Sequence, residues 1–466
     1  MSLDVQKKTV LVLGLGRSGV AAARLLAERG ARVIGVDNAD NEALQTLAKT
    51  LQAQGVETRL GTGQLGRVTA DLAVLSPGFP PENTLLRAVE SAGVPVISEL
   101  ELGFRFCPCP VVAITGTNGK TTTTELCAAA LQAGGIATAA AGNIGRAFCD
   151  LLRRGDAKNA EAERIDVAVL EVSSFQLERI ERFRPRVSVM LNVTPDHLDR
   201  YSSMRDYAAA KERVFMNQQS DDLAVVNADC ANDFTSLRRA DAPRQIVFSA
   251  RGRREGCAMW LEGTKLCSAQ AGELLDMAAT HLRGPHNAEN IMSALAVGEA
   301  FKMPLEVANQ AIATYRPLPH RCEFVTEIDG VSYVNDSKAT NTDAVEKALA
   351  GFDRPVVLIA GGKDKGFDFA TLNETLRRKV KLAVLIGETR EKLMASWSPS
   401  VRCVKADTLE AAVRSARQNA QRGDVVLLSP ACSSFDMFKS YEDRGKQFKQ
   451  IVRTLASGQE ISRAKH

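Results

Sequence analysis

Aromatic side chains and clustered positive charge are both scarce in this chain. Aromatic residues make up 5% of its 466 positions, and 59 lysines and arginines are nearly balanced by 55 acidic residues, for a net charge of +4. A nucleic-acid-binding protein usually concentrates basic residues on one face and adds aromatic rings that stack on bases. We therefore expect no nucleic-acid partner.

Paired cysteines are missing as well. The ten cysteines are scattered along the sequence, and only Cys107 and Cys109 stand close together, in a C-P-C tripeptide. The sequence has no C-x-x-C pair and no Cys/His cluster with the spacing of a zinc site. This cysteine usage indicates reduced thiols in a cytosol.

A long apolar run is the third absence. The N-terminal VLVLGLG stretch is too short and too interrupted by glycine for a signal peptide, and no run approaches the roughly 20 residues that span a membrane. We expect a cytoplasmic protein that does not insert into a membrane. With 45% hydrophobic and 24% charged residues, the composition is that of an ordinary globular chain, and its length predicts about three domains.

The stretch over residues 111–124, VVAITGTNGKTTTT, carries the strongest chemical signal. An apolar run typical of a strand ends in a glycine-containing loop, Gly119-Lys120-Thr121 follows, and a helical pattern comes next. Such a loop points backbone N–H groups at a phosphate chain and adds a lysine and a magnesium-binding hydroxyl. The strict P-loop pattern requires glycine at position 114, where this chain has Ile114, and the loop glycine is Gly116 instead. We interpret the stretch as a variant P-loop for a nucleoside triphosphate; the alternative is a glycine turn with an incidental lysine.

A second glycine loop lies near the N-terminus. Residues Thr9 to Leu13 predict a strand, GLGRSG follows at residues 14–19, and a helical pattern and another strand lead to Asp37. This βαβ unit matches the dinucleotide fingerprint, in which the glycines admit a phosphate and the carboxylate meets a ribose. A Rossmann-like turn that holds another nucleotide, or none, is an equal alternative. The small-residue loop Ser76-Pro77-Gly78 follows a strand at Leu72 to Leu75 and should line the same crevice.

Polar residues follow two later strands. Glu171 ends the apolar strand over residues 167–170, where an α/β sheet places magnesium ligands; without the P-loop it would be a charge at a helix start. Asn143 stands in the small-residue loop Ala139 to Gly145, which either faces a ligand or only turns the chain. His197 belongs to a dense polar cluster that follows the strand over residues 187–192, and such clusters often mark a functional loop.

Two helices carry further candidates. Lys211 lies among alanines on a helix that begins near Met204, where a lysine is ordinarily a solvated charge. His286-Asn287 and Asn290 open an alanine-rich helix that continues to Phe301. By itself this pattern describes a capped helix with a histidine near its positive end.

The segment Arg316-Pro317-Leu318-Pro319 predicts a linker, because its prolines interrupt both helix and sheet. Beyond it, strands alternate with helical patterns, which predicts another α/β sheet; the strands are expected over residues 331–335, 356–360, 382–386 and 425–428. Polar loops follow three of them, at residues 336–341, 361–366 and 429–435. We expect these loops to gather at one edge of the sheet and form a ligand surface.

Several motifs now occur together in order: GTNGKTT at 116–122, LEVSSFQLE at 170–178, NVTPDHLDRY at 192–201, HNAEN at 286–290, HR at 320–321, DSKATN at 336–341 and SPACSSFDMF at 429–438. With them the sequence resembles the Mur ligases of peptidoglycan synthesis over essentially its whole length. GLGRSG and DSKATN make it most similar to the members that add D-glutamate, rather than to those that add L-alanine or a diamino acid, or to folate polyglutamylation enzymes.

The resemblance implies an α/β protein of three domains. They are a Rossmann-like domain for the UDP substrate over residues 1–109, a central P-loop ATPase-type parallel-sheet domain over 110–317, and a C-terminal Rossmann-like amino-acid domain over 318–466. It also implies an ATP-dependent amide-forming ligase that adds D-glutamate to UDP-N-acetylmuramoyl-L-alanine through an acyl phosphate, releasing ADP and phosphate. We expect a monomer acting in the cytoplasm.

The matching motifs assign residues to four tasks. Expected to take part in phosphoryl transfer are Lys120, Glu171, His197, Lys211 and Lys338. Expected to bind ATP are Gly116, Thr117, Asn118, Gly119, Lys120, Thr121, Thr122, Asn287, Asn290, Arg321 and Asp336. Expected to bind the UDP substrate are Gly16, Arg17, Ser18, Asp37, Gly78 and Asn143. Expected to bind D-glutamate are Thr340, Lys365, Ser434 and Tyr441, although the family often has phenylalanine at the last position, and Lys363 is an alternative to Lys365.

The resemblance also implies two Mg²⁺ ions. Thr121 and Glu171 would hold the first, and the second is expected near His197. A protonated lysine has three donors and no acceptor, so it cannot ligate a cation. In the family, the lysine that matches Lys211 is carbamylated by carbon dioxide and so gains carboxylate-like oxygens.

Two other interpretations compete with a ligase. A Rossmann oxidoreductase would use Gly14 to Asp37 to bind NAD(P). A catalytically silent nucleotide-binding protein would keep the fold alone, but all five residues assigned to phosphoryl transfer are present, which argues against it.

Overall fold

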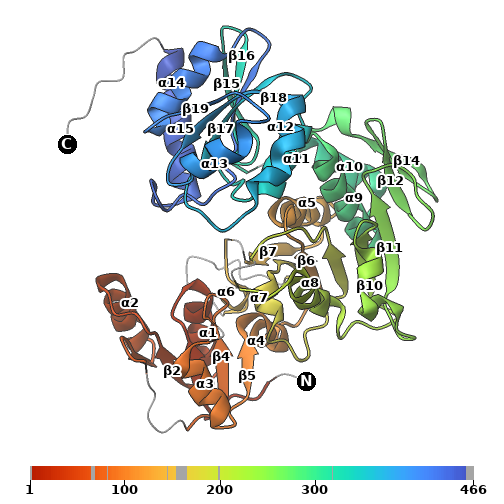
Figure 1. The fold of residues 1–466 in the computed structure, drawn as a ribbon. Coiled ribbons are helices and arrows are strands. Elements are labelled where there is room, and N and C mark those ends of the chain that lie inside the picture. Colours follow the sequence, from red (N-terminus) through yellow and green to blue (C-terminus); the bar gives the residue numbers. More distant parts are fainter. Residues whose placement is uncertain are drawn as a thin grey trace.

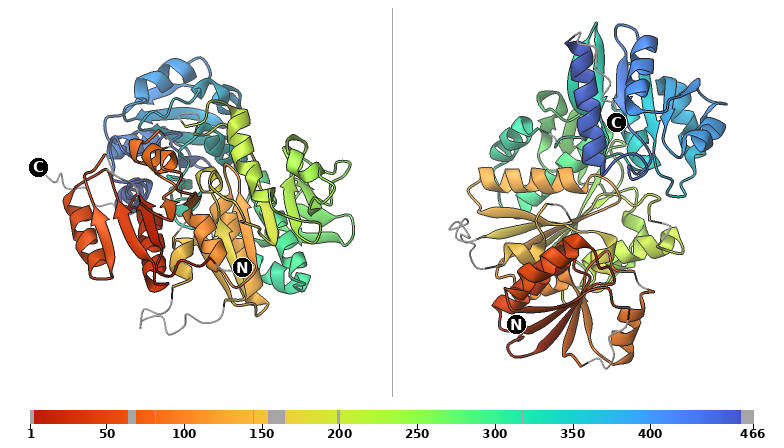
Figure 2. Two further views of the ribbon diagram at one scale, coloured as in Figure 1. Left: turned by 90° about the horizontal axis from the view of Figure 1, so that it is seen from below. Right: turned by 90° about the vertical axis from the view of Figure 1, so that its left-hand side faces the viewer.

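Three sheets follow one another along the chain (Figure 1). The computed structural model describes residues 3–63, 69–80, 82–143, 145–153, 165–197, 200–316 and 318–457. In both Figure 1 and the right panel of Figure 2, the domain with the central sheet lies between the other two. Within the described ranges, no helix has the length and apolar character needed to cross a membrane.

The first sheet is wholly parallel, with the order β3-β2-β1-β4-β5. Its strands are β1 (Thr9–Leu13), β2 (Arg32–Val36), β3 (Val56–Arg59), β4 (Leu72–Leu75) and β5 (Val96–Ser98). Its helices are α1 (Arg17–Glu28), α2 (Glu42–Gln52), α3 (Thr84–Ser91) and α4 (Glu99–Phe106). The strand order reverses between β1 and β4, and the loops that follow these two strands therefore open into one crevice. This is the Rossmann-like domain that the sequence predicts.

The central sheet has the order β14-β13-β12-β11-β10-β9-β6-β8-β7. Its strands are β6 (Val111–Thr115), β7 (Thr138–Gly142), β8 (Val167–Glu171), β9 (Val187–Met190), β10 (Leu223–Asn227), β11 (Arg244–Ser249), β12 (Met259–Glu262), β13 (Lys265–Ser268) and β14 (Gly272–Asp276). The strands from β7 to β12 are parallel, as predicted, but β12, β13 and β14 pair antiparallel. Only Gly263 and Thr264 separate β12 from β13, and a connection this short can join only antiparallel strands.

Helices cover both faces of the central sheet. They are α5 (Lys120–Ala133), α6 (Phe148–Leu151), α7 (Ser174–Leu177), α8 (Met204–Glu212), α9 (Pro285–Ala300) and α10 (Leu305–Thr314). Val112 and Ile114 of β6 pack into one hydrophobic core with α5 and α9, whereas Val111 and Ala113 pack into a second core on the opposite face. Because alternate side chains of a strand point to opposite faces, β6 is buried from both sides.

One local prediction needs correction. Residues Ala139 to Gly145 were expected to form a loop, but Ala139 to Gly142 lie in β7, which pairs with β8. Small side chains are compatible with a strand when the neighbouring strand supplies the hydrogen bonds, so tertiary pairing overrides the weak local preference. Asn143 follows the end of the strand, and Ile144 lies outside the described residues.

The third sheet has the order β15-β16-β20-β17-β18-β19 and is parallel except for the β15–β16 pair. Its strands are β15 (Glu323–Ile328), β16 (Val331–Asn335), β17 (Val356–Gly361), β18 (Val380–Ile386), β19 (Cys403–Lys405) and β20 (Val425–Leu428). Its helices are α11 (Thr342–Ala350), α12 (Asn373–Lys379), α13 (Arg390–Trp397), α14 (Leu409–Asn419) and α15 (Tyr441–Ala456). Asp329 and Gly330, both with positive φ, form the tight β15–β16 turn. Pro317 of the predicted linker lies outside the described residues.

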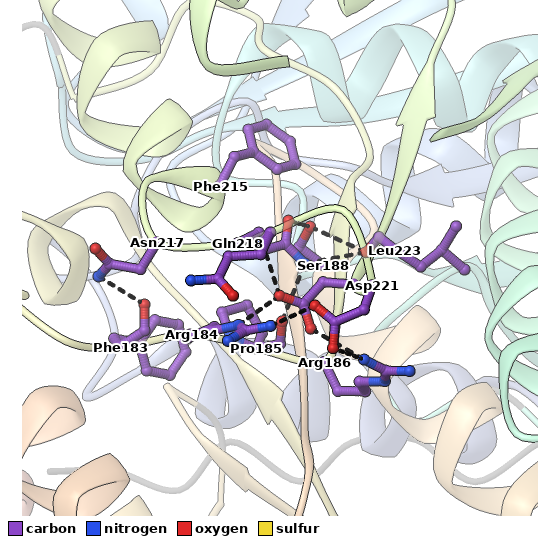
Figure 3. Close-up of polar contacts among 12 residues, drawn as sticks. Phe183, Arg184, Pro185, Arg186, Ser188, Phe215, Asn217, Gln218, Asp221 and Leu223 are labelled. Carbon is purple, nitrogen blue, oxygen red and sulfur yellow. Dashed lines mark hydrogen bonds and ion pairs between the residues drawn. The ribbon is translucent and has the colours of Figure 1, made fainter. Parts of the chain in front are cut away.

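A paired charge cluster lies at the amino end of β9 (Figure 3). Arg184 Nε is 2.6 Å from the buried Asp222 Oδ2, and Arg186 Nη1 is 2.9 Å from Asp221 Oδ2. The Ser188 hydroxyl donates to Gln218 Oε1 at 2.7 Å. These contacts connect β9 to the segment that leads into β10, at the sheet edge opposite the P-loop.

Candidate active site

The loop between β6 and α5 has the geometry of a phosphate-binding loop. Gly116 (φ +150°) and Gly119 (φ +88°) adopt backbone conformations that favour glycine, and a Cβ atom at Gly119 would lie 2.4 Å from Asn290 Oδ1. Gly119 is the N-cap of α5 and supplies no side-chain cap. The first N–H groups of the helix therefore point toward the loop without a side-chain acceptor, which is the arrangement that binds phosphate.

Two lysines share one backbone carbonyl in this loop. Lys120 Nζ donates to Gly116 O at 2.9 Å and to Thr117 O at 2.8 Å. Lys211 Nζ, which comes from α8, also donates to Gly116 O at 2.9 Å. Burial lowers the pKa of Lys120, although the carboxylates of Glu171 and Asp196 oppose this effect. Two ammonium groups on one acceptor repel each other, so the pair is suited to an anion placed between them.

Lys211 is the most deeply buried of these lysines, with 1% of its surface exposed. Its Nζ also lies 4.6 Å from the centre of the Tyr207 ring. Burial, and then the charge of Lys120, hold the pKa of Lys211 well below its usual value. A lysine that loses its proton becomes a nucleophilic amine, which is the form that reacts with carbon dioxide.

A hydroxyl and a carboxylate converge beside the loop. The Thr121 hydroxyl donates to Glu171 Oε2 at 2.7 Å, and Asn143 Nδ2 donates to Glu171 Oε1 at 2.8 Å. Arg321, from the third domain, donates through Nη2 to Thr121 Oγ1 at 2.6 Å. Oxygen ligands of this kind suit Mg²⁺, so Thr121 and Glu171 fit the first expected metal.

His197 lies close to this centre in a strained backbone conformation, with φ +55°. Its ring packs edge-on against Phe175 at 4.8 Å, and its Nε2 is 3.8 Å from Asp196 Oδ2. Burial lowers the pKa of His197, and the nearby positive charges of Lys365, Lys211 and Lys120 add to this effect while Asp196 opposes it. Leu198 and Asp199 of the same motif lie outside the described residues.

The remaining residues assigned to ATP surround the loop. Thr123 donates to Asn290 Oδ1 at 3.0 Å, and Asn290 Nδ2 donates to Asn287 Oδ1 at 3.0 Å. The Thr117 hydroxyl donates to Thr194 O at 3.0 Å, and Thr122 is buried on the first turn of α5. The α9 residues thus line up beside the start of α5.

The residues assigned to the UDP substrate gather in the β1–β4 crevice and extend toward the central domain. Asp37 accepts the Leu15 N–H at 2.8 Å and the Ala39 N–H at 3.0 Å. A Cβ at Gly14 would lie 3.0 Å from Ser76 Cβ, which confirms that the two loops line one crevice. Arg17 Nη2 donates to Asn143 O at 2.9 Å and so joins the first domain to the central one.

The other three residues assigned to this substrate lie in the same loops. Gly16 is the N-cap of α1, and Ser18 lies in the first turn of that helix. Gly78 is exposed, and a Cβ there would meet nothing within 4 Å. The fold alone therefore does not require glycine at position 78.

The polar loops of the third domain also meet, as predicted. Asp336 accepts the Ser429 hydroxyl at 2.9 Å and the Cys322 N–H at 3.1 Å, and burial raises its pKa to about 7. Lys363 N donates to Ser433 O at 3.0 Å, which connects the second loop to the third. Lys363 is thus held through its backbone, whereas the charge of Lys365 contributes to lowering the pKa of His197.

Lys338 and Tyr441 lie against each other at this edge. Lys338 Nζ is 3.8 Å from the centre of the Tyr441 ring, and burial together with the charge of Arg321 lowers the lysine pKa to about 8. The side chain of Thr340 is half-buried, and Ser434 is 2% exposed.

The structure adds residues that the sequence analysis missed. Asn118 Nδ2 of the P-loop donates to Asp343 Oδ2 on α11, across the domain boundary. Arg444 is fully buried and donates to Ser337 O at 2.9 Å and Cys432 O at 3.2 Å, which fixes two third-domain loops together. Burial lowers the pKa of Arg444 to about 10. An arginine on an amphipathic helix ordinarily faces water, so the sequence around Arg444 did not indicate that this side chain is buried.

Comparison with known proteins agrees with this geometry. Three family models match consecutive parts of the chain: Mur ligase MurD-like, N-terminal domain (residues 8–98), Mur ligase middle domain (114–298) and Mur ligase, glutamate ligase domain (320–432). Together they match more than half of the chain.

Relatives and solved structures extend the comparison. A UDP-N-acetylmuramoylalanine–D-glutamate ligase of Koribacter versatilis is 42% identical over 97% of this chain and 99% of its own length. The enzyme of that name from Trichlorobacter lovleyi is 44% identical over 97% of this chain and 100% of its own length. Two solved structures share the fold. A pseudomurein peptide ligase of Methanothermus fervidus has a TM-score of 0.60 and 18% sequence identity, and the alignment covers 96% of this chain and 100% of that chain. The MurC ligase of Thermotoga maritima has a TM-score of 0.59 and 18% identity, with the same coverage of 96% and 100%. The chain therefore belongs to the Mur ligase family.

Proposed function

We propose that this chain is the ATP-dependent ligase that adds D-glutamate to UDP-N-acetylmuramoyl-L-alanine in the cytoplasm, during synthesis of peptidoglycan precursors. The observation that carries this proposal is the meeting of three domains at one loop. Arg321 of the third domain contacts Thr121 at 2.6 Å, and Asn143, which contacts Glu171 at 2.8 Å, also receives Arg17 of the first domain at 2.9 Å. Full-length relatives above 40% identity carry the name of this activity.

The chemistry explains why three ligands must meet. A carboxylate does not react with an amine at neutral pH unless one of its oxygens becomes a leaving group. The carboxylate oxygen of the UDP substrate attacks the γ-phosphorus of ATP, and ADP leaves. The amine of D-glutamate then attacks the carbonyl carbon of the acyl phosphate, phosphate leaves with the C–O bond electrons, and the amine loses a proton as the amide forms.

The lysines of the site supply the charge for this step. Lys120 would exchange the carbonyls of Gly116 and Thr117 for phosphate oxygens, and Lys338 would approach the γ-phosphate from the third domain. Thr117, Asn118, Asn287, Asn290 and Asp336 would position the nucleotide. In the structure Lys120 contacts backbone carbonyls and Lys338 contacts the Tyr441 ring. A phosphate chain is a stronger partner for either cation, which supports this role.

Oxygen ligands beside the loop are proposed to hold magnesium. Thr121 and Glu171 would bind one ion, and His197 would lie near a second. Bound Mg²⁺ neutralises the phosphate charge and lets two anionic substrates approach each other. Asn143 keeps Glu171 oriented through its 2.8 Å hydrogen bond.

Lys211 is proposed to act as a carbamate. Its amine is buried, its pKa is strongly lowered, and it lies beside the shared carbonyl of Gly116. A carbamate would replace the second positive charge with two oxygens. It would thereby remove the repulsion from Lys120 and add an oxygen partner near the metal site.

The outer domains are proposed to deliver the two substrates. Gly16, Arg17, Ser18, Asp37 and Gly78 would bind the UDP portion, and Asn143 would contact the substrate nearer its reacting end. Thr340 and Lys365 would hold the α-carboxylate of D-glutamate. Ser434 and the backbone near Tyr441 would bind the side-chain carboxylate of the same amino acid. We also propose domain boundaries near residues 109 and 317, and a monomeric enzyme.

Phosphate release tests the proposal. The purified protein with UDP-N-acetylmuramoyl-L-alanine, ATP and magnesium should release phosphate only when D-glutamate is added. L-Glutamate and other amino acids are the matched controls. Release at the level of the D-glutamate-free control would reject the ligase, and tight binding of NAD(P) by calorimetry would favour an oxidoreductase instead.

A further inference from the structure

The C-P-C segment at residues 107–109 has no part in the chemistry proposed above. It connects the end of α4 to the start of β6 and therefore lies at the junction of the first and central domains (Figure 1). Both thiols are free and half-buried.

The backbone places the two thiols side by side. Cys107 caps α4 in an extended conformation, with φ −74° and ψ 122°. Pro108 explains this, because a residue that precedes proline is excluded from helical geometry. In an extended chain, residues two apart project to the same side. The Cys107 and Cys109 Sγ atoms are accordingly 3.4 Å apart, and Cys107 Sγ is also 3.4 Å from Cys109 O.

The two sulfurs differ in character. The pKa of Cys109 is lowered because the Cys107 thiol donates to its sulfur, with help from the backbone N–H of Ala168. The pKa of Cys107 is raised by its hydrogen bond with the Cys109 sulfur and by burial. Cys107 Sγ can also donate to Cys109 O, so we assign the proton to Cys107 and the attacking sulfur to Cys109, with Cys107 as the neighbouring thiol that can resolve an oxidised sulfur.

A structural metal explains the pair poorly. Zinc in a structural site takes about four ligands, typically cysteine and histidine. Across the described ranges, no group of three or more His, Cys, Asp or Glu side chains could hold a metal ion. Two adjacent sulfurs are, however, sufficient for dithiol chemistry.

We propose that Cys107 and Cys109 form a redox-active dithiol site, which hydrogen peroxide converts to an intramolecular disulfide and a small thiol restores. The Cys109 thiolate attacks one peroxide oxygen, the O–O bond breaks, and hydroxide leaves to give a sulfenic acid. The Cys107 sulfur then attacks Cys109 Sγ, the S–O bond breaks, and water leaves. In total, two thiols and one peroxide give one disulfide and two water molecules.

The disulfide requires only a local movement. The sulfur–sulfur distance must shorten from 3.4 Å to about 2.05 Å. The two-residue spacing with proline between keeps this adjustment within the junction. A cytosolic disulfide of this kind is expected to be transient rather than structural.

Thiol mapping on the full-length protein tests the site directly. The reduced protein is treated with stoichiometric hydrogen peroxide, alkylated, digested and analysed by mass spectrometry. Wild type should lose two free thiols, both in one peptide that carries residues 107 and 109, and regain them with glutathione. Ten free thiols after treatment, or a loss centred on other cysteines, would overturn the proposal.

Single variants separate the two sulfurs. Cys107→Ser should accumulate a sulfenic acid at Cys109 that dimedone traps, whereas Cys109→Ser should react much more slowly and form no disulfide. Cys257→Ser is the matched control, because that thiol is also half-buried, and it should behave as wild type. Equal thiol loss in Cys107→Ser and wild type would contradict a paired site.

Discussion

The two ends of the neighbouring parallel strands β6 and β9 use charge in opposite ways. At the amino end, the guanidinium groups of Arg184 and Arg186 lie within 2.5–3.4 Å of the carboxylates of Asp221 and Asp222, so each cation has an anion. At the carboxyl end, Lys120 and Lys211 instead contact the carbonyl of Gly116. Paired charges hold elements together, whereas two buried lysine amines on a shared carbonyl carry an energetic cost, which an anionic ligand or the proposed carbamate at Lys211 would offset. The first arrangement is structural, and the second is the one that we propose to bind a substrate.

The largest effect is expected at the carboxyl end. Lys120→Ala should lower turnover by about 10³-fold, because it removes the cation that we propose stabilises the transferring phosphoryl group. Phosphate release measures this, while the thermal unfolding midpoint should change little. Lys265→Ala removes an exposed lysine paired with Glu273 and serves as the matched control with normal turnover. Normal turnover in Lys120→Ala would show that Lys120, like the arginine–aspartate pairs at the amino end, has only a structural role.

Lys211→Ala should reduce turnover by about 100-fold, since it removes the carbamate that we propose as an oxygen partner near the metal. Small carboxylates added to the assay should partly restore activity by occupying the vacated space. The same carboxylates should not rescue Lys120→Ala, which lacks a cation rather than an anion. A complete absence of rescue in Lys211→Ala would argue against the carbamate.

The amino end should respond in stability instead of activity. Asp222→Ala leaves two arginines without their buried partner and should lower the free energy of unfolding by about 2 kcal/mol, below the full buried-pair value because the arginines are partly exposed. Turnover per folded molecule should stay at the wild-type level. Asp221→Ala is the control, because its side chain is 62% exposed, and its unfolding midpoint should move much less. Urea unfolding measures both.

Glu99 is a buried carboxyl that belongs to neither group of charges, and its effect on stability should depend on pH. Burial raises the pKa of Glu99 to about 7 from its usual 4.5, and its Oε2 has no hydrogen-bond partner among the described residues. The folded chain therefore keeps a proton that the unfolded chain releases, so this contribution to stability is complete below pH 4.5 and is lost as the pH rises through 7.

Glu99→Gln removes the titration. The variant should gain up to about 3 kcal/mol over wild type at pH 8 and much less at pH 4.5. Urea unfolding at both pH values measures the difference, and an equal effect at both would show that packing rather than protonation is responsible.

Local chemistry made much of the site predictable. β1 and β6 were expected at the residues where they occur. Gly116 and Glu171 stand at strand ends and Lys120 begins α5, because loop chemistry and strand periodicity are local. What escaped prediction depends on tertiary contact. The strand at Ala139 to Gly142 exists because β8 pairs with it, and the buried Arg444 is satisfied by carbonyls from loops far along the chain. The Asn118–Asp343 contact similarly depends on how two domains meet.

The hydrogen bond from Arg321 to Thr121 also relates two equilibria, the docking of the third domain and the binding of nucleotide. Because the donor belongs to the third domain and the acceptor to the P-loop, docking of that domain and the proposed binding of nucleotide to the loop would act on the same pair of atoms. Linkage is reciprocal: if a bound nucleotide changes the docking equilibrium by some factor, docking changes nucleotide affinity by that same factor. One guanidinium would thereby make the nucleotide affinity of the central domain depend on the position of the third domain.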